Sequence, residues 1–72
     1  MHHTVRTVYL VSVANARERI LNAAEARLLA GGPTSLVLDA VAADAGVSKG
    51  GLLYHFASKE ALVVGLCERM LV

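Results

Sequence analysis

The segment from Leu38 to Glu60, with the sequence LDAVAADAGVSKGGLLYHFASKE, constrains the fold of this chain most strongly. Small and apolar residues recur at helical spacing on both sides of Gly46, and glycine readily takes the positive φ that ends a helix. Ser48 follows immediately after the turn, and serine is a preferred N-cap. The pattern predicts two short helices joined by a tight turn, a helix-turn-helix over about residues 37–56.

The structural residues of this motif are predicted from their size and polarity. Ala42 is small where the two helices must cross closely, and Gly46 stands four residues later at the turn. The apolar side chains of Val41, Val47 and Leu52 are expected to fix the angle between the helices, and Phe56 is expected to lie in the core. Each residue type is common alone, and their agreement carries the prediction.

A longer amphipathic helix is predicted before this motif. Asn15 and Glu18 have the spacing of a capping box at its start. Gly31-Gly32-Pro33 ends it, because proline cannot continue the helical hydrogen bonds. Its core side is expected to carry four apolar residues: Ile20, Leu21, Ala24 and Leu28.

The other helices follow from their caps. Thr34 and Ser35 are candidate caps for a helix over about residues 37–45, and the next helix is expected over residues 49–55. Ser58 caps a fourth helix that continues to the end of the sequence. Its buried residues are expected to be Leu62, Val63, Leu66, Cys67, Met70 and Leu71. The predicted fold is all-α: a three-helix bundle with a helix-turn-helix, plus the start of a fourth linking helix.

Size and composition limit what this fold can do alone. The 72 residues make one small domain, and 56% of them are hydrophobic, so part of the apolar surface is expected to meet another domain or subunit. Seven Lys/Arg against six Asp/Glu give a net charge of +1, which is not the strongly basic balance of a nucleic-acid binder. Any contact to DNA must come from local placement of a few cations: Arg6, Arg17, Arg19, Lys49 and Lys59.

Several other functions are excluded by the residues present. A single cysteine and no Cys/His cluster leave no disulfide and no metal site, and no catalytic Ser/His/Asp set or phosphate loop is present. No enzymatic activity and no cofactor are therefore expected. The apolar run Val8–Val13 is too short for a signal-peptide core or a membrane span. Residues 1–14 are predicted to form a mobile arm before a domain over residues 15–72.

The second helix of a helix-turn-helix can enter the major groove of DNA. Gly50 and Gly51 together cost about 2 kcal/mol of helix propensity relative to alanine. Close approach of the backbone to another surface is one reason for such a cost.

The residues also resemble the N-terminal DNA-binding domain of the tetracycline-repressor (TetR) family of bacterial transcriptional regulators, from Arg17 to about Leu62. The resemblance rests on R-x-x-I-L-x-A-A from Arg17, V-A-x-x-A-G-V-S from Val41, K-G-x-L from Lys49 and H-F-x-S-K-E-x-L from His55. It implies a cytoplasmic, nucleoid-associated repressor that binds a palindromic operator in double-stranded DNA as a homodimer. It also implies a C-terminal domain for dimerisation and an inducer, which is expected to be absent from these 72 residues.

Carried onto this sequence, the resemblance implies eight DNA-binding candidates: Ser48, Lys49, Gly50, Gly51, Leu53, Tyr54, His55 and Lys59. Lys49 can reach a guanine edge or a phosphate, and Tyr54 and His55 can donate to phosphate oxygens. Lys59 with the first amides of the fourth helix can bind another phosphate. Packing or solvation is the ordinary alternative role for these side chains.

Two departures from the family pattern weaken the DNA prediction. Val37 stands where many members have a capping threonine that touches phosphate, and Leu53 stands where many have tyrosine. Leu53 can instead meet a thymine methyl group. The alternative function is a helical protein-interaction module that keeps the fold and has weak or no DNA binding.

Overall fold

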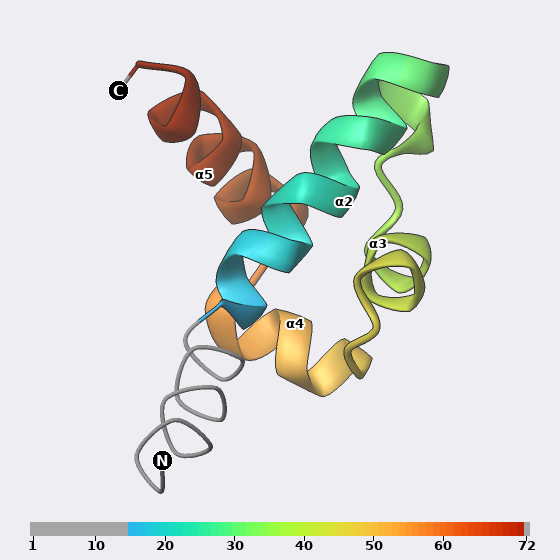
Figure 1. Ribbon diagram of the computed structural model, residues 1–72, viewed down its shortest axis with the longest axis vertical. Helices are drawn as coiled ribbons and strands as arrows, with labels where there is room; N and C mark the ends of the chain where they lie inside the picture. Colours follow the sequence, from blue (N-terminus) through green and yellow to red (C-terminus); the bar gives the residue numbers. More distant parts are fainter. Residues whose placement is uncertain (1–14, 72) are drawn as a thin grey trace, which may run out of the picture.

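The computed structural model describes residues 15–71, which contain helices and turns and no strand. The elements are α2 (Ala16–Gly31), a single 3-10 turn η1 (Pro33–Ser35), α3 (Leu38–Ala45), α4 (Lys49–His55) and α5 (Lys59–Leu71) (Figure 1). The all-α prediction is confirmed. The predicted arm at residues 1–14, with Arg6, lies outside the described residues.

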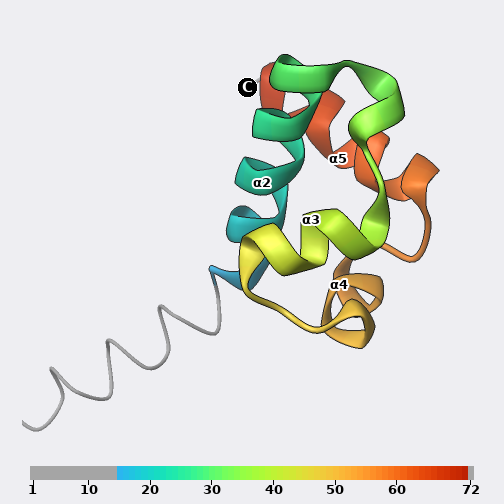
Figure 2. The ribbon, with the colours of Figure 1, turned by 90° about the vertical axis from the view of Figure 1, so that its right-hand side faces the viewer.

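Helix α2 is the centre of the bundle. It contacts α3, α4, α5 and η1, and α3 also contacts α4. Figure 1 shows α5 on one side of α2 and α3 on the other, and Figure 2 looks onto α3 with α2 and α5 behind it. The core therefore lies around one face of α2 and is closed by the helix-turn-helix and by the first half of α5.

The core is made of aliphatic side chains from every helix and of one aromatic ring, that of Phe56. Ile20, Leu21 and Ala24 of α2 are buried at the predicted helical spacing, and Leu28 is partly buried against them. The remaining buried hydrophobic residues are Leu36, Val41, Ala42, Ala45, Leu52, Phe56, Leu62 and Leu66. No buried polar or charged residue is found in the described part of the chain.

The predicted capping box at the start of α2 is wrong. Asn15 precedes the helix, but its side chain makes no capping hydrogen bond. The carboxylate of Glu18 lies 3.3 Å from the guanidinium of Arg69, at the other end of the described chain, and 3.7 Å from that of Arg17. Glu18 is thus turned toward cations and not back toward the Asn15 amide. The predicted end of the helix is correct, since Gly32 has φ +77° and donates its N–H to the Leu28 carbonyl at 2.9 Å.

The predicted serine or threonine cap of α3 is also wrong. Val37 is the N-cap residue, with an extended backbone and no side-chain hydrogen bond, and the helix begins at Leu38. The hydroxyl of Ser35 donates to the carbonyl oxygens of Arg27 at 2.6 Å and Gly32 at 2.7 Å. It therefore ties η1 to the end of α2.

Helix α5 buries fewer residues than its sequence predicts. Leu62, Gly65 and Leu66 are buried, whereas Val63 is 41% exposed and Met70 is 79% exposed. Leu71 and Cys67 are exposed as well, so the prediction that these four side chains lie in the core is wrong. The reason is close packing at Gly65: a Cβ atom there would lie 2.7 Å from Cε1 of Phe56. That approach turns the neighbouring apolar positions outward.

The second half of α5 is held to α2 by Arg69. Its guanidinium donates to the carboxylate of Glu25 at 3.2 Å, to that of Glu18 at 3.3 Å, and to the side-chain oxygen of Asn22.

Among residues 15–71, no helix has the length and apolar character needed to cross a membrane.

Candidate nucleic-acid interface

The turn between α3 and α4 has the geometry that Gly46 predicts. Gly46 takes φ +72° and ψ +31°, the left-handed conformation, as the C-cap of α3. The amide of Val47 donates to the Ala42 carbonyl at 3.0 Å, and that of Gly46 donates to the Ala43 carbonyl at 3.2 Å. These bonds satisfy the last carbonyls of α3 and reverse the chain within a few residues.

Helix α4 is started by a serine cap and held by two buried side chains. The hydroxyl of Ser48 accepts from the Gly51 amide at 3.0 Å. Leu52 is 0% exposed and Phe56, the C-cap residue, is 3% exposed. Val41 and Ala42 of α3 are buried in the same core, and Val47 is packed against it. The six predicted structural residues thus occupy the crossing, the turn and the anchor points of the motif.

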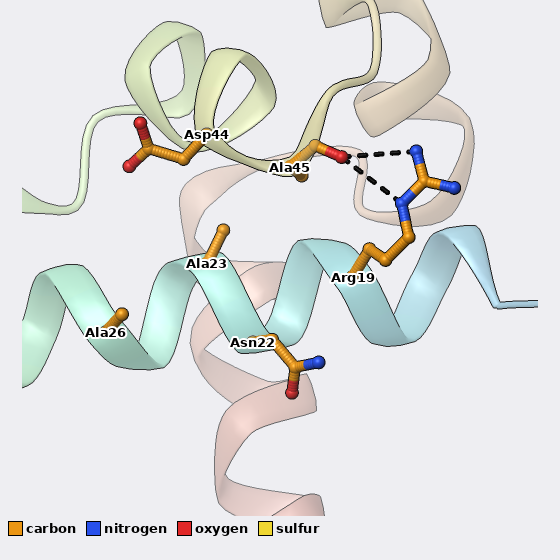
Figure 3. A pocket seen from close by; sticks show the side chains of 6 residues that line it. All are labelled: Arg19, Asn22, Ala23, Ala26, Asp44 and Ala45. Atoms are coloured by element: carbon orange, nitrogen blue, oxygen red, sulfur yellow. Dashed lines mark hydrogen bonds between the residues drawn. The ribbon is translucent and has the colours of Figure 1, made fainter.

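Two arginines of α2 hold the helix-turn-helix in place. Arg19 donates to the Ala45 carbonyl through Nε at 3.3 Å and Nη2 at 3.2 Å (Figure 3), and it reaches the Gly46 carbonyl at 3.4 Å. The guanidinium of Arg17 lies 5.1 Å from the centroid of the Phe56 ring, within cation–π range. From the sequence, both are predicted as possible DNA cations; their contacts are not predicted, because they join residues far apart in the chain.

A shallow groove of about 520 Å³ runs beside the Arg19 contact, between α2 and α3. Figure 3 shows Asn22 pointing away from α3, whereas Ala23 points toward it. On α3, Asp44 accepts from Nε of Arg27 at 2.6 Å.

No group of His, Cys, Asp or Glu side chains suited to a metal ion occurs in the part of the chain that the structure describes.

The sequence that forms α2, the helix-turn-helix and the first part of α5 matches a known class of regulators. The family model for bacterial regulatory proteins of the tetR family matches residues 20–66. This chain belongs to the tetR family. No curated protein and no solved structure shows significant similarity to it. Family membership makes the domain a DNA-binding domain of a transcription regulator and not a catalytic one.

In this tetR-family domain, α4 carries most of the predicted DNA-binding residues on its exposed side. Tyr54 is 85% exposed and Leu53 is 36% exposed. Ser48, Lys49 and Gly50 are exposed at the start of the helix, and Gly51 is half-buried. His55 is half-buried, with its ring edge-on to that of Tyr54 at a centroid distance of 5.1 Å. The structure therefore brings seven of the eight candidates to one short helix and its cap.

The two glycines of α4 differ in their surroundings. A Cβ atom on Gly50 would meet nothing within 4 Å, so packing within residues 15–71 does not require glycine there. A Cβ atom on Gly51 would lie 3.2 Å from the Ser48 hydroxyl, which is the N-cap acceptor. A contact within the domain thus explains why residue 51 is glycine, whereas no contact in the described structure explains the glycine at position 50.

The two lysine candidates have different partners. Lys49, the first residue of α4, places Nζ 3.2 Å from Oδ1 of Asp39 on α3. Lys59, the eighth candidate, is the exposed first residue of α5. It also lines an apolar cavity of about 210 Å³ with Val63, so its methylene stem covers part of that apolar surface. The sequence does not predict the contact between Asp39 and Lys49, because a surface aspartate has no local signature.

The two residues predicted to depart from the tetR-family pattern, Val37 and Leu53, are both exposed. Val37 is 52% exposed at the N-cap position of α3, where its side chain makes no capping hydrogen bond because it has no polar atom. Leu53 leaves about a third of its surface free on α4. Neither apolar side chain is needed to complete the core.

Proposed function

We propose that this tetR-family domain binds one half of a palindromic operator in duplex DNA, as part of a homodimer, and represses transcription by occupying the operator. In this proposal it acts in the bacterial cytoplasm on the nucleoid, and a small-molecule inducer binds outside residues 15–71. The proposal rests on the way α4 is oriented. Leu52 and Phe56 are buried and anchor the helix, while Lys49 and Tyr54 are exposed.

Each exposed side chain has a role that suits its chemistry. Lys49, near the start of α4, donates to a guanine edge or a phosphate. The hydroxyl of Tyr54 and the imidazole of His55 donate to phosphate oxygens, which sets the register of the protein on the duplex. Ser48 keeps the first turn of α4 closed through its bond to the Gly51 amide.

A second phosphate site is proposed at the start of α5. The first amides of a helix have no intrahelical acceptor and attract anions. Ser58 already accepts from the Ala61 amide at 3.1 Å, which leaves the amides of Lys59 and Glu60 to face the phosphate. The ammonium group of Lys59 adds a positive charge at a helix end that otherwise disfavours cations.

Gly50 is proposed to let the backbone of α4 lie close to the DNA. The space where its side chain would be is empty in the described structure. A methyl group placed there would therefore meet the DNA and not the protein.

A titration of labelled duplex at several salt concentrations tests the proposal. Wild-type chain is expected to bind at low salt, and Lys49→Ala and Lys59→Ala are each expected to weaken binding and to reduce the salt slope by about 1. Arg27→Ala is the matched control, because it removes one partly exposed positive charge from α2, outside the eight candidates, where Arg27 pairs with Asp44 of α3. Unchanged affinity and slope in Lys59→Ala would remove that residue from the interface.

The alternative function is a helical protein-interaction module, which the exposed apolar side chains of Val37 and Leu53 favour. A form of the chain dimerised through an appended coiled coil separates the two functions, because it restores the avidity of two half-sites. Absence of binding in that form at low salt would reject operator binding and support the interaction module.

A further inference from the structure

An ion pair joins the first turns of α3 and α4. Oδ1 of Asp39, the second residue of α3, lies 3.2 Å from Nζ of Lys49, the first residue of α4. The side chains remain 71% and 56% exposed, respectively. The contact therefore presents a carboxylate and an ammonium group side by side on the surface that carries the reading helix.

Stability does not explain this acidic group. Exposed ion pairs contribute little to folding, because solvent screens them and both side chains lose freedom. A carboxylate beside the reading lysine also opposes binding to the phosphate backbone, since like charges repel. A role in choosing the DNA sequence accounts for a group that general affinity would disfavour.

The geometry points to Asp39 as a specificity-determining residue, and we propose that Asp39 and Lys49 together read a G·C base pair. The proposal rests on operator binding through α4. The carboxylate of Asp39 accepts from the N4 amino group of cytosine, while the ammonium group of Lys49 donates to O6 and N7 of guanine.

The spacing of the two groups matches the edge of a G·C pair. Guanine O6 and cytosine N4 are hydrogen-bonded to each other, so they lie about 2.9 Å apart in the major groove. The ammonium and carboxylate groups lie 3.2 Å apart. One base-pair edge can therefore be matched by one side-chain pair without separating the two charges.

The order of groups along the edge selects G·C over A·T. From purine to pyrimidine, G·C presents acceptor, acceptor and donor, whereas A·T presents acceptor, donor, acceptor and a methyl group. With Lys49 on the purine side, A·T would place the N6 donor against the ammonium group and the O4 acceptor against the carboxylate of Asp39. With the reverse placement, adenine N6 can donate to the carboxylate and thymine O4 can accept from the ammonium group, but the ammonium group loses its second acceptor, N7, which then lies beside the carboxylate. G·C is therefore favoured because it gives the ammonium group two acceptors and keeps the carboxylate away from N7.

Selection of binding sequences from randomised duplex DNA, at low salt, tests the pair in the full 72-residue chain. Wild type is expected to enrich a G·C pair at one position of each half-site. Asp39→Ala is expected to lose about five- to tenfold of that preference, the lower range for one good base contact. It is also expected to bind other sequences as tightly as wild type or more tightly.

Asp44→Ala is the matched control. Asp44 is also on α3 and also pairs with a cation, but its partner is Arg27 on α2. The control is expected to keep the G·C preference. The proposal would be overturned if Asp39→Ala selected the same DNA sequences as wild type. It would also be overturned if Asp39→Ala and Asp44→Ala raised the affinity for all sequences by the same factor. If wild type enriches no sequence even in the form dimerised through an appended coiled coil, that result would instead contradict operator binding itself.

Discussion

Replacing Gly65 by alanine is expected to destabilise the domain, although alanine is the better helix former. Gly65 is buried within α5, and a Cβ atom there would lie 2.7 Å from Cε1 of Phe56 and 3.3 Å from Cδ2 of Leu21. The Phe56 ring is 3% exposed, so it cannot move aside into solvent. Overpacking of this kind costs about 1–3 kcal/mol. Helix propensity returns about 1 kcal/mol of that cost.

Gly50→Ala is the internal reference for this prediction. The substitution is chemically the same and also lies in a helix, but a Cβ atom on Gly50 would meet nothing within 4 Å. It is expected to raise the free energy of unfolding by up to about 1 kcal/mol. The difference between the two variants therefore isolates the packing cost at Gly65, about 1–3 kcal/mol.

Urea and thermal unfolding followed by circular dichroism measure this difference. In a domain of this size, each kcal/mol shifts Tm by about 4–8 °C. Equal urea dependence of the unfolding free energy in the two variants would show that the unfolded states are alike. A Gly65→Ala protein as stable as the Gly50→Ala protein would refute the close approach of α5 to Phe56.

Two further substitutions test how the helix-turn-helix and α5 are held. Leu52→Ala removes the fully buried side chain of α4 and is expected to lower the free energy of unfolding by about 2–5 kcal/mol in urea unfolding; a loss below 1 kcal/mol would contradict its central place in the core. Ser58→Ala removes the acceptor of the Ala61 amide and is expected to cost about 1 kcal/mol in the same assay. Ser58→Asn retains an acceptor and should restore most of that stability.

The parts of the fold that the sequence predicts correctly are those with local causes. Ser48 accepts from an amide three residues later, and Ser58 does the same. Gly46 ends α3 through its own backbone conformation. Such contacts are contained in a few consecutive residues, so residue type and spacing suffice to predict them.

The incorrect predictions involve partners that are distant in the chain. Glu18 has the spacing of a capping residue but binds Arg69, which is 51 positions later. Helix α5 is apolar around much of its surface, so periodicity cannot select its buried face. The approach of Phe56 to Gly65 selects it, and that approach exists only in the folded domain.

In the candidate interface, too, some residues can be predicted from the sequence and others depend on contacts that exist only in the folded domain. The family pattern predicts Lys49 and Tyr54 as DNA contacts, because the resemblance supplies their positions. It does not reveal Asp39, whose meaning depends on the 3.2 Å contact to Lys49. The role of Arg19 cannot be predicted from the sequence either, because the Ala45 carbonyl that it binds lies 26 positions away.

Helix α4 meets the core through very little of its own length. Of its seven residues, all within the described part of the chain, Leu52 is the one that is buried. The turn that orients the helix is held from outside by Arg19 of α2. The residues that stabilise α4 and the residues proposed to contact DNA are thus largely different. Under that proposal, a few surface substitutions are enough to change the preferred DNA sequence, without compensating changes in the core.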